Sequence, residues 1–164
     1  MTFAPRTWVV GEVVTAALLN QEVRDQIGSM LAAWTSYTPT WTASTNPVLN
    51  NGTATGAYMK IGRTCHCQFQ ITAGSTTTFG SGGYMVGVPF TSAASGLVSM
   101  GAGRFTGSQT WYGVVTLGSN VAACNVIFPL TTANTTGANA ASNAPESWAN
   151  GHTLRGSLTY QTAS

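Results

Sequence analysis

Apolar and polar residues alternate with a period of two between Arg63 and Thr72. The apolar positions are Cys65, Cys67, Phe69 and Ile71. Because successive side chains of a strand point to opposite faces, these four share one face and the polar residues between them share the other. A half-buried strand is not stable by itself. The pattern therefore predicts further strands beside this one and a second layer over its apolar face.

The chain after residue 36 contains enough short strands to build both layers. Residues 53–61 read as a strand, and a tight connection at Gly62-Arg63 makes residues 63–73 its hairpin partner. Further strands are expected at 37–41, 84–88, 96–105, 111–117, 124–128 and 154–160, with surface loops at 74–83 and 130–144. This spacing predicts a mainly β protein, an antiparallel β-sandwich of jelly-roll-like type.

Residues 1–36 follow a different pattern. Residues 1–12 are expected to form an extended arm, and Thr15 then offers a helix N-cap. Apolar residues recur afterwards at helical spacing, at Leu19, Val23, Ile27, Met30 and Trp34. We call these five residues the helix stripe, because that spacing places them on one face of a single helix over 16–34. We therefore expect an N-terminal attachment arm and helix (1–36) and a β-sandwich head domain (37–164).

The helix stripe has two ordinary explanations. It packs on the side of its own head domain, or it meets copies of itself about a symmetry axis, as in a short coiled coil. The large side chains at its C-terminal end, Met30, Leu31 and Trp34, favour the second explanation, because little sequence around the helix is available to bury them. The helix stripe is therefore the expected assembly site.

The composition narrows the class of protein. Charged residues make up 6% of the chain, against about 25% in an average globular protein. Five Trp, five Tyr and six Phe make the chain unlike a disordered one. The six basic residues are scattered and the net charge is +2, so we expect no binding to nucleic acid. The chain has no run of roughly 18 apolar residues, which indicates no membrane insertion.

The sequence offers little for metal or catalytic chemistry. A disulfide between Cys65 and Cys67, which lie two residues apart on one extended strand, would be too strained. Both cysteines are therefore interpreted as small buried hydrophobes. His66 points away from both thiols, which argues against a zinc site. From residue 37 onward the only acidic residue is Glu146, whereas glycosidases use two carboxylates, and no Gly-x-Ser-x-Gly motif is present. We expect no enzyme, no metal and no cofactor.

Aromatic residues are the best candidates for recognition. Flat rings can stack on sugar faces, and loops at the ends of a sandwich commonly carry binding residues. The expected surface-binding residues are Phe79, Tyr84, Tyr112 and Trp148, and Trp41 and Trp111 also read as exposed rings. The alternative for each ring is packing in the core or at a subunit interface.

Three segments resemble virion proteins of bacteriophages. Residues 7–20, Thr-Trp-Val-Val-Gly-Glu-Val-Val-Thr-Ala-Ala-Leu-Leu-Asn, with Val23-Arg24-Asp25 after them, resemble the N-terminal segment of tail and fibre-like proteins, especially in phages of actinobacteria. Asn51-Gly52-Thr53 through Gly56, Tyr58 and Gly62-Arg63-Thr64 is similar to the opening of their β domain. Residues 145–152, followed by Leu154 and Tyr160, resemble the closing motif of trimeric jelly-roll heads of the complement and tumour-necrosis-factor type, with His152 where an acidic residue often stands.

The resemblance implies a homotrimeric minor tail or fibre-type virion protein with a jelly-roll head. Its expected function is adhesion to the host surface, with a host cell-surface glycan as the candidate partner. The alternative is capsid decoration, in which residues 1–36 dock on other virion proteins. The opening residues lack a basic segment followed by an apolar core, and we expect synthesis in a host cytoplasm and localisation in the virion.

Overall fold

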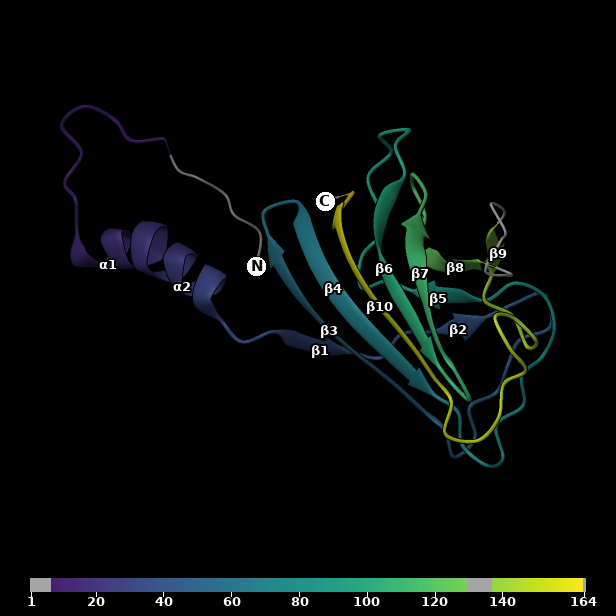
Figure 1. The fold of residues 1–164 in the computed structure, drawn as a ribbon. Coiled ribbons are helices and arrows are strands. Elements are labelled where there is room, and N and C mark those ends of the chain that lie inside the picture. The colour runs from purple at the N-terminus through teal and green to yellow at the C-terminus, as the bar shows by residue number, and fades with distance from the viewer. Residues whose placement is uncertain (1–6, 130–136, 164) are drawn as a thin grey trace.

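Strands dominate the computed structural model, which describes residues 7–129 and 137–163 (Figure 1). In chain order the strands are β1 (Thr35–Tyr37), β2 (Trp41–Thr42), β3 (Thr53–Ile61), β4 (Thr64–Thr72), β5 (Met85–Gly87), β6 (Ser99–Thr106), β7 (Thr110–Leu117), β8 (Ala123–Pro129), β9 (Gly137–Asn139) and β10 (Thr153–Gln161). They form one ten-stranded antiparallel sheet that follows a short helical segment. The prediction of a mainly β, antiparallel, sandwich-like fold is confirmed.

The sheet curls around a single core. Its strand order is β1-β3-β4-β10-β6-β7-β8-β5-β2, and β9 pairs with β8. The surroundings of Tyr37 on β1 show that the part of the sheet around β4 approaches the part around β8. Burial raises the pKa of its hydroxyl, and the thiols of Cys67 on β4 and Cys124 on β8 raise it further. Because β4 and β8 are not neighbours in the sheet, both can lie near one hydroxyl only if the sheet folds over on itself.

The hairpin of β3 and β4 forms as the alternation predicts. Thr53 pairs with Thr72 and Ile61 with Thr64, in an unbroken register. The four apolar residues of β4 are all buried, and β10 pairs along the whole opposite edge of β4. Cys65, Cys67 and Cys124 are buried free thiols. The interpretation of Cys65 and Cys67 as small core residues is confirmed.

One row across the sheet consists almost entirely of glycine. In register, it runs through Gly56 (β3), Phe69 (β4), Gly156 (β10), Gly103 (β6) and Gly113 (β7). Large side chains of the core lie directly against the bare backbone at these positions, such as the Tyr37 ring at Gly56 and the Phe69 ring at Gly156. Since no Cβ atoms intervene, the layers can close to the distance that the curl of the sheet requires.

The helical segment projects from the head domain at its N-terminal side (Figure 1). It comprises α1 (Ala16–Leu19), a π-helical turn η1 (Asn20–Arg24) and α2 (Asp25–Leu31). Thr15 caps it as expected, with its Oγ1 accepting a hydrogen bond of 3.2 Å from the Leu18 N–H. No helix in the described part of the chain has the length and apolar character needed to cross a membrane.

The prediction of one regular α-helix as far as Trp34 is wrong. The helix ends at Leu31, and Ala32 is already extended. Trp34 instead places its ring edge-on to His66, with 5.1 Å between the ring centroids. Thr35 then pairs with Tyr58 on β3. Pairing with the sheet draws the chain out of the helix before the apolar spacing ends.

Two further expectations need correction. The segment 37–41 is not one strand, because β1 and β2 lie at opposite edges of the sheet, and the buried Pro39 stands between them. The expected loop 130–144 contains β9, which pairs with β8, while 130–136 lies outside the described residues. The division of the chain into 1–36 and 37–164 stays a prediction, and pairing with β3 begins at Thr35, just before that boundary.

Candidate functional site

The expected surface-binding residues lie in very different environments. Tyr84 and Trp148 are only 1% and 6% exposed and belong to the core. Phe79 is half-buried, with its ring centroid 5.9 Å from that of Trp148. Tyr112 alone among the four is well exposed, at 72%. The prediction that Tyr84 and Trp148 present binding surfaces is therefore wrong, and Tyr112 stays a candidate.

A cluster of aromatic rings explains this burial. The Trp148 centroid lies 5.2 Å from Trp41, 5.6 Å from Tyr84 and 4.9 Å from Phe105. The Tyr84 hydroxyl donates to the Phe79 carbonyl oxygen at 2.7 Å, which satisfies its polar atom inside the core. Trp41, expected to be exposed, is buried as well, at 7% exposed. These rings stabilise the head domain and do not present a surface to a ligand.

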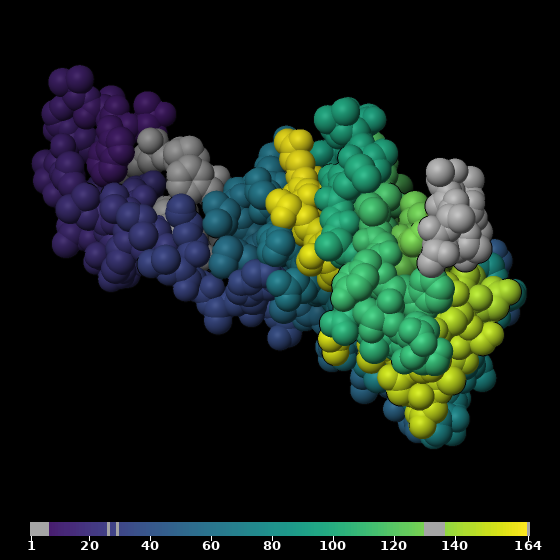
Figure 2. Space-filling model, in the orientation of Figure 1, coloured from purple at the N-terminus to yellow at the C-terminus, as the bar shows by residue number. Residues whose placement is uncertain are grey.

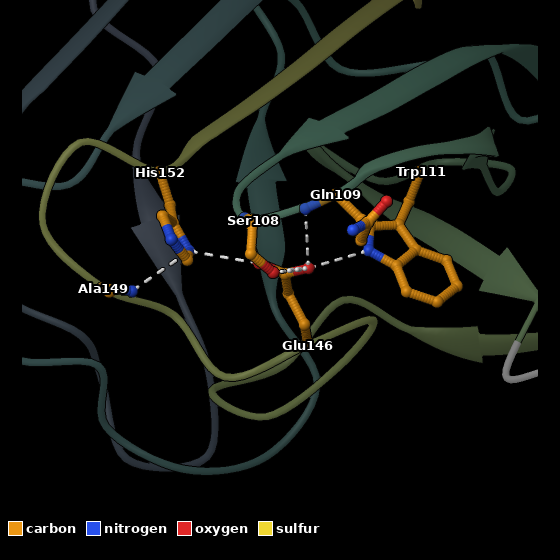
Figure 3. A network of polar contacts seen from close by, with 6 residues as sticks. All are labelled: Ser108, Gln109, Trp111, Glu146, Ala149 and His152. Carbon is orange, nitrogen blue, oxygen red and sulfur yellow. Dashed lines mark hydrogen bonds and ion pairs between the residues drawn. The ribbon is translucent and has the colours of Figure 1, made fainter.

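Glu146 fastens the loop before β10 to the turn between β6 and β7 (Figure 3). Its Oε1 accepts from the Ser108 N–H at 2.7 Å and from the Ser108 hydroxyl at 3.0 Å. Its Oε2 accepts from the Gln109 N–H at 3.3 Å and from Trp111 Nε1 at 3.0 Å. This network gives the half-buried Trp111 a structural role.

The network keeps the Glu146 carboxylate charged. Desolvation acts to raise its pKa, but the hydrogen bonds from Trp111, Ser108 and Gln109 outweigh that effect and lower it. His152 approaches with Nδ1 at 3.8 Å from Oε1, yet this nitrogen also accepts the Ala149 N–H at 3.2 Å. The carboxylate therefore joins two loops, with its oxygens occupied by donors of its own chain.

A hollow of about 640 Å³ lies on the outward face of β3, β4, β10, β6 and β7. Figure 2 shows this face, with the yellow end of β10 between the blue β4 and the teal β6. We call it the sheet hollow. One row of paired residues crosses it in register, running from β3 to β7 through Thr55, Gln70, Arg155, Arg104 and Tyr112.

The two arginines dominate the charge of the sheet hollow. Arg155 Nε donates to Gln70 Oε1 at 2.7 Å, and Gln70 Nε2 donates in turn to Thr72 Oγ1 at 3.0 Å. Arg104 is exposed and directly opposite Arg155 in the β6–β10 register. Among the described residues, neither guanidinium forms an ion pair. The sheet hollow therefore presents uncompensated positive charge.

The sequence pattern did not single out Arg104 or Arg155. Alternation places each on the polar face of its strand, since Arg104 precedes the buried Phe105 and Arg155 follows the buried Leu154. That signal cannot show that the two strands pair, which brings the arginines together only in the folded sheet. Within the described residues, no group of His, Cys, Asp and Glu side chains is arranged to hold a metal ion.

The helix stripe is only partly covered by the head domain, through the contact of Trp34 with His66 on β4. Its helical members are half exposed, at 48% for Leu19, 47% for Val23, 53% for Ile27 and 43% for Met30. Trp34 lies beyond the helix and is 37% exposed. Four large apolar side chains on one projecting helix make an unusual amount of apolar surface for an isolated chain.

The comparisons with known proteins add no relative. No protein-family model, curated protein or solved structure matches the chain. The sheet hollow and the helix stripe are accordingly the two surfaces on which a function can be argued, the first through charge and hydrogen bonding and the second through apolar burial.

Proposed function

We propose that this chain is a structural protein of a bacteriophage virion, a tail-associated or fibre-type protein that adheres to the host surface as a homotrimer. The observation that carries the proposal is the helix that projects from the β head (Figure 1). Its apolar side chains remain half exposed. The resemblance of residues 7–20 to phage tail proteins supports the assignment to a virion.

Self-association would give the helix stripe the partner that its own head does not supply. Burying half-exposed side chains such as Leu19 and Ile27 is favourable by roughly 25 cal/mol for each Å² of apolar surface removed from water. Three parallel helices around an axis would bury these residues against their own copies. The three head domains would then point in one direction, as adhesion requires.

Capsid decoration is the second candidate, and the same projecting helix favours it. In that case the helix stripe docks on another virion protein instead of on its own copies. The location of the protein in the virion distinguishes adhesion at the tail from capsid decoration. Immunogold labelling of particles with an antibody against the head domain should mark the tail tip, whereas labelling confined to the capsid shell would support decoration and refute adhesion at the tail.

Light scattering tests the assembly step. The full chain should have three times the mass of 17.0 kDa, about 51 kDa. The double variant Val23→Glu, Ile27→Glu should be monomeric, because it places charges in the proposed seam. The matched control is Ala17→Glu, Gly28→Glu, which puts the same charges on the opposite face of the helix and should remain a trimer. A monomeric wild-type chain, or a trimer that survives the first variant, would refute assembly through the helix stripe.

A further inference from the structure

The arrangement of Arg104 and Arg155 is costly to the fold in the absence of a ligand. Residues directly opposite each other on neighbouring antiparallel strands have Cβ atoms roughly 5 Å apart, and like charges in such a pair repel. The register places these two arginines in that relation on the outward face of β6 and β10. A pair of this kind indicates a site for an anion that lies between both guanidinium groups.

Among the residues that the structure describes, no acidic side chain forms an ion pair with Arg104 or Arg155. The four acidic residues are Glu12, Glu22, Asp25 and Glu146. The first three precede the sheet in sequence, and Glu146 is engaged by Ser108, Gln109 and Trp111. The sheet hollow therefore offers its positive charge to an anionic group of another molecule.

The arginines differ in how firmly they are held. Gln70 fixes Arg155 through the 2.7 Å hydrogen bond to Nε, and Thr72 fixes Gln70 in turn. That bond uses Nε alone, which leaves the terminal nitrogens of Arg155 to a ligand. The Arg104 side chain is exposed and makes no hydrogen bond within the described residues, so it can adjust to a bound group. A guanidinium fork matches the two oxygens of a carboxylate or phosphate.

The surroundings of the pair suit a sugar ring. Tyr112 pairs directly with Arg104 and is 72% exposed, which leaves a flat aromatic face beside the positive charge. Two residues further along the strands, on the same face, Ala57, Ser157 and Ala102 stand beside Gln68, and these three small side chains leave room above the strands. The volume of about 640 Å³ lies within the roughly 300–1,000 Å³ of small-ligand sites. An inorganic ion alone would not fill it.

We propose that the sheet hollow binds an acidic saccharide, with its carboxylate or phosphate held by Arg104 and Arg155 and its ring stacked on Tyr112. The inference deepens the proposed adhesion function and rests on it for the place where the ligand occurs. The chemistry of recognition stands on the residues of the sheet hollow alone. Gln70 acts as a positioning residue that orients Arg155.

Calorimetry on the full chain at low salt tests the proposal. The carboxylate probe is a tetramer of galacturonic acid, and its fully methyl-esterified form is the neutral control. The phosphate probe is an oligomer of ribitol phosphate. Binding of either acidic probe, with no binding of the methyl ester, is the expected result, and the preferred probe identifies the source of the anion. Affinity should fall with added salt, because exposed charges are screened beyond a Debye length of roughly 10 Å at 0.1 M.

Substitutions assign the binding to these residues. Arg104→Gln and Arg155→Gln should each raise the dissociation constant on the order of tenfold, as expected for the loss of one charged hydrogen-bond partner. Tyr112→Ala should weaken the saccharide probes but not the binding of inorganic phosphate. The matched control is Arg24→Gln, which removes the same charge from the helix, where Arg24 pairs with Asp25 at 2.8 Å. It should bind like the wild type.

Several results would overturn the proposal. The first is failure of the wild type to bind either acidic probe. The second is a loss of affinity in Arg24→Gln equal to that in the sheet-hollow variants. The third is equally tight binding of a single-stranded oligonucleotide, which would indicate a general polyanion surface. A changed oligomeric mass in Arg104→Gln would instead make the hollow an interface between copies of the chain. If Arg104→Gln still adheres to host cells as the wild type does, the inference fails while the adhesion function stands. If the probes bind but the wild type does not adhere to host cells, the adhesion function fails while the inference about the sheet hollow stands.

Discussion

Replacing Gly156 with alanine tests whether the glycine row sets the curl of the sheet. Gly156 lies on β10 between Phe69 on β4 and Gly103 on β6. A methyl group added there would stand 2.6 Å from Cε1 of the Phe69 ring and 2.9 Å from Cγ2 of Val115. Phe69 is 3% exposed and Val115 is fully buried, so neither side chain has space into which it can move.

The expected loss of stability is the difference between two effects. Overpacking a dense core costs about 1–3 kcal/mol. Alanine restricts the unfolded chain more than glycine does, which returns about 0.4–1 kcal/mol. Because both contacts at Gly156 are closer than van der Waals distance and both partners are confined, we expect Gly156→Ala to lower the free energy of unfolding by about 1–2 kcal/mol. For a domain of this size that corresponds to about 3–6 °C in Tm.

Urea titration followed by circular dichroism measures the effect. Gly28→Ala on the exposed face of α2 is the control, since a methyl group there meets nothing within 4 Å and should not destabilise the protein. A double-mutant cycle with Phe69→Leu adds a sharper criterion, because the smaller side chain should relieve the clash and make the double variant more stable than the sum of the single effects. A Gly156→Ala variant as stable as the wild type, or a strictly additive cycle, would refute the argument.

Two further predictions concern titratable groups. Hydrogen bonds lower the pKa of the Glu146 carboxyl in the folded chain, against the effect of desolvation. The carboxylate therefore stabilises the fold fully above the pKa that Glu146 has in the unfolded chain. This stabilisation is lost as the pH falls through the lower pKa of the folded chain. Thermal melts between pH 7 and pH 3 should therefore show a steeper acid loss for the wild type than for Glu146→Gln, and equal slopes would contradict this. Burial raises the pKa of the Cys124 thiol to about 12, so iodoacetamide at neutral pH should leave it unmodified until urea unfolds the chain; rapid modification of the native protein would contradict the buried position.

Most of the long strands could be predicted because their signal is local. Each alternation around Phe69, Val126 or Leu158 identifies a buried face without knowledge of any partner strand. The helix end could not be predicted in this way. Trp34 continues the apolar spacing, but the pairing of Thr35 with Tyr58 ends the helix earlier. That competition depends on β3, a strand that is distant in the sequence.

Burial of Trp148 shows a second limit of local patterns. Polar and small residues surround it in sequence, such as Ser147, Asn150 and Gly151, and such a context is typical of an exposed loop. The loop is nevertheless anchored over the core, because Glu146 fastens it to the β6–β7 turn and the Trp148 N–H donates to the Ser142 carbonyl at 3.0 Å. The contact between Glu146 and Ser108 joins residues that lie far apart in the chain, so a window of local sequence cannot contain it.

The two surfaces on which the function is proposed differ in how local their sequence signals are. The helix stripe is a local pattern and was visible in the sequence, whereas the sheet hollow exists only through the register of β10 with β6. They share no residue, so substitutions in one should leave the intrinsic property of the other unchanged. They are coupled only through valency. Exposed arginines would bind a single anionic group weakly, but in the proposed trimer three copies would meet a polymer with a raised effective concentration, which would increase the overall affinity without any new contact. Assembly through the helix would thus make a weak saccharide site sufficient for adhesion.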